Sequence, residues 1–76
     1  MKELLTYIAQ SLVEHPEEVV VTERSGGGET ILELRVASTD MGKVIGRQGR
    51  IAKMIRTLMR SVAQHNGTRV TVEIVD

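Results

Sequence analysis

The sequence of 76 residues contains no cysteine, tryptophan or phenylalanine, and it has one tyrosine and one proline. Without cysteine, neither a disulfide framework nor a thiolate metal site is available, and nothing argues against a reducing cytoplasm. No apolar run approaches the length that crosses a bilayer. The first twenty residues carry four glutamates, so a signal peptide is not expected. These absences predict a cytoplasmic protein that does not span a membrane.

Aromatic side chains are nearly absent, and this excludes one group of nucleic-acid-binding modules. RRM, cold-shock and OB modules stack bases on aromatic rings. Tyr7 is the only aromatic residue in the chain. We expect it to pack at the edge of a helix rather than to stack on a base.

Charge is balanced overall but segregated along the chain. Ten basic and ten acidic side chains give a net charge of zero. Residues 1–42 hold three basic and eight acidic side chains, a net charge of −5, and residues 43–76 hold seven basic and two acidic ones, a net charge of +5. Six basic residues and no acidic one lie between Lys43 and Arg60. Because local potential attracts a polyanion more than net charge does, this stretch suits nucleic acid.

Hydrophobic periodicity predicts helices and strands in a mixed order. The expected elements are a helix over 2–14, strands over 19–24 and 31–37, a short helix over 39–45, a long helix over 50–65 and a strand over 68–75. Pro16 ends the first helix. The glycines from Gly26 to Gly28 join the first two strands as a hairpin, and oxygens from Ser38 to Asp40 are expected to cap the short helix.

The long helix is expected to be amphipathic. At about 100° per residue, its apolar residues fall on one arc: Ile51, Met54, Ile55, Leu58, Met59, Val62 and Ala63. We therefore expect Met54 and Met59 to fill the core. The opposite arc is largely basic.

The connections predict the topology. The two helices between the second and third strands form a crossover long enough to make these strands parallel, whereas the first two strands form an antiparallel hairpin. The expected fold class is α+β, with a three-stranded mixed sheet and helices packed on one face. Residues 1–76 are expected to form one domain.

The stretch Ile45-Gly46-Arg47-Gln48-Gly49-Arg50-Ile51 is the most informative of the chain. Gly46 falls where the short helix ends, and a glycine there can adopt positive φ. Gly49 falls where the long helix begins. Without side chains at these positions, a ligand backbone can lie close to the turn, where free N–H groups of the helix suit a phosphate.

This turn, in the predicted order of helices and strands, resembles that of the KH domain, in which a Gly-x-x-Gly loop clamps about four nucleotides of RNA. The resemblance spans the whole chain. An initial helix makes it similar to the bacterial type II form, with the order α-β-β-α-α-β, and its length is similar to that of the KhpA family. A KH groove holds bases by apolar contacts and edge hydrogen bonds, and so needs no aromatic residue.

The resemblance implies a binding site for single-stranded RNA. The backbone clamp would consist of Gly46, Arg47, Gln48 and Gly49. The flanking phosphate contacts would be Lys43, Arg50 and Lys53. The apolar floor of the groove would include Ile45, Ile51 and Val72.

The KhpA resemblance further implies a post-transcriptional regulator or RNA chaperone bearing on cell growth and shape. It would act as a homodimer, or as a heterodimer with a KhpB-like KH protein. The alternative is a protein-interaction module that uses the KH fold to dimerise and binds little RNA.

An enzyme finds no support in the sequence. There is no nucleophile with a base at suitable spacing and no nucleotide P-loop. His15 and His65 lie at predicted helix ends, without a nearby cysteine or second histidine, so no metal or other cofactor is expected.

Overall fold

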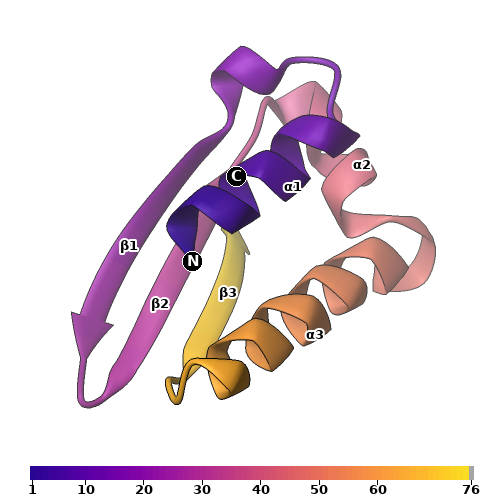
Figure 1. Cartoon of the computed structure of the whole chain (residues 1–76). Helices are drawn as coiled ribbons and strands as arrows, with labels where there is room; N and C mark the ends of the chain where they lie inside the picture. Colours follow the sequence, from indigo (N-terminus) through magenta and orange to yellow (C-terminus); the bar gives the residue numbers. More distant parts are fainter. Residues whose placement is uncertain (76) are drawn as a thin grey trace.

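A three-stranded sheet carries helices on one of its faces (Figure 1). The computed structural model describes residues 1–75. In chain order, with η marking short 3₁₀ helices, the elements are α1 (Lys2–Leu12), η1 (Pro16–Glu18), β1 (Val20–Gly26), β2 (Glu29–Arg35), η2 (Ser38–Asp40), α2 (Met41–Ile45), η3 (Arg47–Gly49), α3 (Arg50–His65) and β3 (Val70–Val75). This order confirms the expected α+β fold class and the type II KH layout.

The strands pair as the connections predict. The order is β1-β2-β3, with β1 antiparallel to β2 and β2 parallel to β3. Gly27 and Gly28 turn the hairpin with φ of 60° and 79°, and positive φ at both positions is typical of a tight two-residue turn that matches the twist of the strands. The sheet therefore has two free edges, β1 and β3.

The core lies between the sheet and the helices α1 and α3. Leu32 and Leu34 alternate on the inner face of the central strand and are fully buried. The cluster of buried residues consists of Leu5, Ala9, Val21, Leu32, Leu34, Ile55, Met59 and Val72. A buried leucine or isoleucine side chain contributes about 1.5–3 kcal/mol by leaving water, so this cluster sets the packing of both long helices on the sheet.

The first helix is shorter than its apolar pattern suggests. It ends at Leu12, and Val13 is already extended (φ −102°, ψ 163°). Pro16 starts η1, because proline disfavours helical geometry in the preceding residue and suits the first position of a helical turn. The packing role expected for Tyr7 is wrong, since 70% of this residue is exposed.

The buried face of α3 also differs from the expected arc. Met59 is buried as expected, but Met54 is 52% exposed and Leu58 is 43% exposed. The buried face is centred on Ile55 and Met59, with the small residues Ala52 and Ala63 at its ends. The two small alanines occupy positions on the buried face, whereas the larger side chains of Met54 and Leu58 lie at the surface.

A buried carboxylate joins the end of α1 to the start of α2. Asp40 is 1% exposed, and it accepts hydrogen bonds from the backbone N–H of Glu14 (3.2 Å to Oδ1) and of His15 (3.0 Å to Oδ2). Within residues 1–75, no side chain caps η2 or α2, so the expected local capping is wrong. The carboxylate instead satisfies two donors 25 and 26 residues away, and so fixes α2 relative to α1.

We predict that Asp40→Ala lowers the free energy of unfolding by about 3 kcal/mol, because two part-buried N–H groups lose a charged acceptor. Asp40→Asn, which keeps one acceptor oxygen, should lose less. Urea unfolding followed by circular dichroism measures both. Glu14→Gln, which removes an exposed carboxylate 3.4 Å from Lys43, is the control and should change stability by less than about 1 kcal/mol. An Asp40→Ala variant as stable as the parent would contradict this role.

Candidate nucleic-acid interface

The turn between α2 and α3 spans residues 46–49, and three of these four residues have positive φ. Gly46 ends α2 with φ 78° and ψ 172°, Gln48 has φ 58° and ψ 26°, and Gly49 begins α3 with φ 75° and ψ 15°. The Gly46 conformation is accessible almost only to glycine, and left-handed backbone is uncommon for a residue such as Gln48. The turn projects away from the sheet at one end of α3 (Figure 1).

The two glycines have different roles. A Cβ built on Gly46 would overlap the side chain of Ile51 and lie 2.9 Å from its backbone nitrogen, so this space is filled by the chain itself. A Cβ on Gly49 would meet nothing within 4 Å. The expectation that ligand backbone approaches both glycines therefore holds sterically only for Gly49.

Several of the expected N–H donors are used inside the turn. The N–H of Gly49 donates to the carbonyl oxygen of Gly46 (3.1 Å), and the N–H of Arg50 donates to that of Arg47. These bonds hold the turn in shape. A phosphate bound at this turn would therefore be held by side chains more than by the backbone N–H groups that the sequence predicts.

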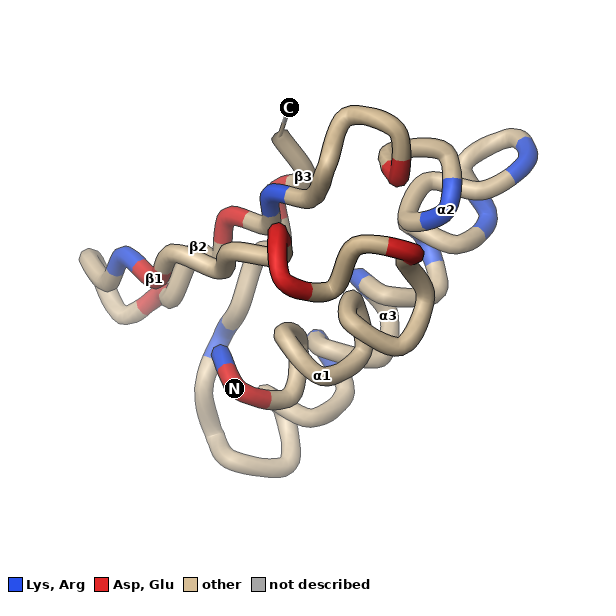
Figure 2. Tube along the Cα trace, turned by 90° about the horizontal axis from the view of Figure 1, so that it is seen from above, with Lys and Arg blue, Asp and Glu red and all other residues tan. Residues whose placement is uncertain are grey.

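The basic side chains around the turn are not equivalent. The Lys43 ammonium lies 3.4 Å from Glu14 Oε1 and 3.9 Å from Asp40 Oδ1, so neighbouring carboxylates already offset its charge. Arg47, Arg50 and Lys53 are exposed, and within residues 1–75 no ion pair involves them. Figure 2 shows that Lys and Arg residues gather around α2 and α3, whereas acidic residues lie along the sheet and around the segment between α1 and β1.

The apolar residues expected in a groove floor occupy three different environments. Ile45 is 37% exposed at the end of α2, and Ile51 is half-buried, packed against the core. Val72 is only 5% exposed and belongs to the core. Ile45 and Ile51 therefore remain candidates for the floor beside the turn, whereas the side chain of Val72 has little surface to offer there.

A second basic feature lies further along α3 and was not singled out from the sequence. A pocket of about 410 Å³ lies between α3 and β3, and its lining includes Arg56, Arg60 and Arg69. The first two belong to the basic arc of the helix, but Arg69 precedes the last strand. Only the packing of β3 against α3 brings the three together.

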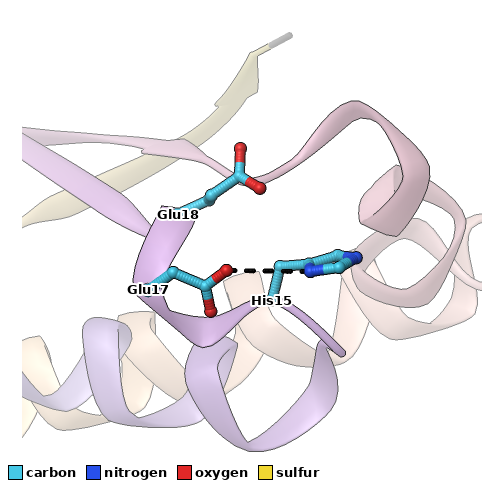
Figure 3. A group of neighbouring side chains, drawn as sticks. All are labelled: His15, Glu17 and Glu18. Atoms are coloured by element: carbon cyan, nitrogen blue, oxygen red, sulfur yellow. Dashed lines mark ion pairs between the residues drawn. The ribbon is translucent and has the colours of Figure 1, made fainter.

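One group of side chains has the composition of a metal site. His15, Glu17 and Glu18 place one potential ligand atom each within 4.8 Å of one another (Figure 3). His15 Nδ1 lies 3.7 Å from Glu17 Oε2, and both side chains are substantially exposed. An exposed ion pair of this kind is worth about 0–1 kcal/mol, and we assign no metal to it.

Comparison with known proteins places the chain in a family. Residues 2–74 match the family model described as KhpA/KhpB, KH domain. The chain is 57% identical over 75 residues to the RNA-binding protein KhpA of Clostridium acetobutylicum, covering 99% of this chain and 100% of that protein. It is 53% identical over 75 residues to that of Treponema pallidum, covering 99% and 94%, and 51% identical over 76 residues to that of Chlamydia pneumoniae, covering 100% and 97%.

Solved structures are similar in fold. The chain superposes on Era of Aquifex aeolicus with a TM-score of 0.66 and 21% identity, over 96% of this chain and 28% of that one. The same values apply to Era in complex with MgGDPNP and nucleotides 1506–1542 of 16S ribosomal RNA. The chain thus spans about a quarter of the length of these proteins.

The sheet topology and the glycine turn between two helices define a KH-domain protein of type II. The chain belongs to the KhpA/KhpB family of KH domains. This is a family of binding proteins and not of enzymes, as the sequence indicated. None of the helices in residues 1–75 is long and apolar enough to cross a membrane.

The two glycines should respond differently to alanine. We predict that Gly46→Ala destabilises the fold by about 3–5 kcal/mol, because a glycine-only conformation and an overlap with Ile51 add together. Gly49→Ala should lose about 1–2 kcal/mol, the cost of a left-handed alanine in open space. Thermal and urea unfolding of the two variants measure the difference, and equal losses would contradict it.

Proposed function

We propose that this protein binds single-stranded RNA at the α2–α3 turn. The observation that carries the proposal is the open side of Gly49, flanked by Arg47, Arg50 and Lys53, which no carboxylate in residues 1–75 neutralises. The names of the KhpA relatives, which describe RNA-binding proteins, support it. Family membership alone would suggest RNA, and the geometry of the turn supports it as the place where the strand would lie.

The residues of the turn have separate parts in this proposal. Gly49 lets the sugar-phosphate backbone approach, and Gly46 keeps Ile51 close beneath the turn. Arg47 and Gln48 donate hydrogen bonds to phosphate oxygens, and a guanidinium does so in bidentate geometry. Arg50 and Lys53 add positive potential, and Lys43 adds less because Glu14 and Asp40 offset its charge. Ile45 and Ile51 support the bases.

The expected affinity of one domain is low. A KH clamp holds about four nucleotides, and the three cations without ion pairs would neutralise about three phosphates, for a log–log salt slope of about −2 on single strands.

A second domain, from another copy or from a KhpB-like KH protein, would raise avidity by about 10²–10⁴ without new base contacts. We propose that the protein works as such a pair in the cytoplasm, as a regulator or chaperone of RNA bearing on cell growth and shape, with residues 1–76 forming one domain.

A module that mainly dimerises is the second candidate function. The exposed side chains of Met54 and Leu58 favour it, because they form an apolar strip on α3 that the core leaves uncovered. Arg50 and Lys53 border this strip. RNA binding and pairing would therefore use adjacent faces of one helix.

We predict that Arg47→Asp with Gln48→Asp abolishes RNA binding, because two carboxylates then face the phosphates. The fold should be retained within about 1 kcal/mol, since both side chains are exposed and aspartate tolerates left-handed backbone. Fluorescence anisotropy with a labelled unpaired oligonucleotide measures binding, and thermal unfolding measures the fold.

Two controls make this experiment specific. Lys2→Asp with Gln10→Asp changes net charge equally on exposed positions of α1 and should leave binding nearly unchanged. A duplex RNA of the same length should bind much more weakly than the single strand, because the narrow turn fits one splayed strand. Retained binding by the turn variant, or equal affinity for the duplex, would refute the proposed site.

Substitutions in the apolar strip of α3 test whether the protein pairs with a second KH domain. We predict that Met54→Lys with Leu58→Lys yields a monomer at micromolar concentration by light scattering, whereas the parent forms a dimer or binds its KH partner. Tyr7→Lys, a charge placed on an exposed side chain of α1, is the control and should leave the mass unchanged. A parent that is monomeric alone and with a KhpB-like protein, yet binds short RNA tightly, would contradict the pairing.

A further inference from the structure

An ion pair joins the helix before the glycine turn to the segment between α1 and β1. The Lys43 ammonium lies 3.4 Å from Glu14 Oε1 and 3.9 Å from Asp40 Oδ1. Lys43 belongs to α2 and precedes Gly46, which ends this helix, by three residues. At a rise of about 1.5 Å per residue, the two positions are about 4.5 Å apart along the helix axis. Lys43 is therefore within reach of a phosphate bound at the turn.

A backbone hydrogen bond places Glu14 beside Lys43. The N–H of Glu14 donates to Asp40 Oδ1 at 3.2 Å, and Asp40 lies one helical turn before Lys43. The carboxylate of Asp40 thus holds the backbone from which the Glu14 side chain extends to Lys43. The ion pair is a product of the tertiary structure, because its two residues are far apart in the sequence.

The two carboxylates near Lys43 differ in their other contacts. Asp40 is buried, and its oxygens accept the two N–H donors that join the end of α1 to α2. The side chain of Glu14 is 72% exposed, and an exposed ion pair adds little to stability. Replacing the Glu14 carboxylate by an amide therefore changes the charge around Lys43, while the backbone hydrogen bond of residue 14 is retained.

Its ion pairs distinguish Lys43 from the other cations of the proposed site. Arg47, Arg50 and Lys53 are exposed, and the described part of the chain contains no ion pair to any of them. For Lys43 to bind a phosphate, its ammonium must leave Glu14. The released carboxylate would then lie near a second anion, which is unfavourable because like charges repel. Glu14 therefore opposes phosphate binding both as a competitor and as a neighbouring negative charge.

We propose that Glu14 withholds Lys43 from RNA and so limits the affinity of the turn. The inference rests on the proposed function and adds a residue outside the turn that sets the strength of binding. In the parent protein three cations neutralise phosphates, and Lys43 contributes little. Without the Glu14 carboxylate, Lys43 becomes a fourth cation for the same strand.

The test measures the affinity of a labelled eight-nucleotide oligouridylate across a salt series, by fluorescence anisotropy. Glu14→Gln should raise affinity about threefold to fivefold, the range that an exposed ion pair supports. Its log–log salt slope should become more negative by about 0.7, the value for one further phosphate on a single strand. Glu17→Gln is the matched control, because it removes one charge from the same segment but from a carboxylate that lies beside His15. It should raise affinity less than twofold and leave the slope unchanged.

A second substitution shows whether Glu14 acts through Lys43. The double variant Glu14→Gln with Lys43→Gln should bind no more tightly than Lys43→Gln alone, and with the same salt slope. A role of Glu14 in stability would not produce this coupling, and thermal unfolding of each variant checks that the fold is retained.

The outcomes separate this inference from the proposed function. An unchanged affinity and slope for Glu14→Gln, an equal gain for Glu17→Gln, or a gain that persists without Lys43 would each overturn the role of Glu14. If the parent binds no RNA, the proposed function fails and this inference fails with it. If binding is lost in Arg47→Asp with Gln48→Asp but does not respond to Glu14→Gln, the turn stands and only the role of Glu14 fails.

Discussion

The position of the glycine turn depends on one buried carboxylate. Asp40 lies directly before α2, and its two oxygens accept hydrogen bonds from the N–H groups of Glu14 and His15, which follow the first helix. A buried charge is tolerated only when hydrogen bonds or opposite charges compensate it, and here backbone donors and nearby Lys43 do so. The interaction ties α2, and the turn that follows it, to a helix more than twenty residues earlier.

The two glycines of the turn differ in their surroundings. Gly46 adopts its conformation so that Ile51 can pack directly against it, and Gly49 leaves an open surface. Internal hydrogen bonds to the carbonyls of Gly46 and Arg47 hold this geometry before any ligand arrives. A preformed loop loses less entropy on binding than a flexible loop does, and this would favour the small RNA site that we propose at the turn.

The helix α3 serves several surfaces at once. Its inner face, around Ile55 and Met59, completes the core. Its first turn completes the proposed RNA site, its exposed Met54 and Leu58 form an apolar strip, and Arg60 reaches the pocket beside β3. A helix can do this because its side chains radiate in all directions at fixed angles. The effect of a substitution on α3 should therefore depend on which face of the helix it lies on, more than on its distance from the turn.

The sequence by itself determined the order of elements, the parallel and antiparallel pairings and the position of the turn, because periodicity, glycine placement and connection length are local properties. Its resemblance to the KH domain indicated the class. The alternation of Leu32 and Leu34 along the chain is likewise a local property, and both side chains lie on the buried face of β2. The sequence could not determine how α3 is rotated about its axis on the sheet, and the expectation that Met54 fills the core is therefore wrong. It also could not show that Asp40 accepts a hydrogen bond from the backbone of Glu14 instead of capping its own helix. Likewise, only the packing of β3 against α3 brought Arg69 beside Arg56 and Arg60. These features join residues far apart in the chain, and tertiary packing alone decides which of them meet.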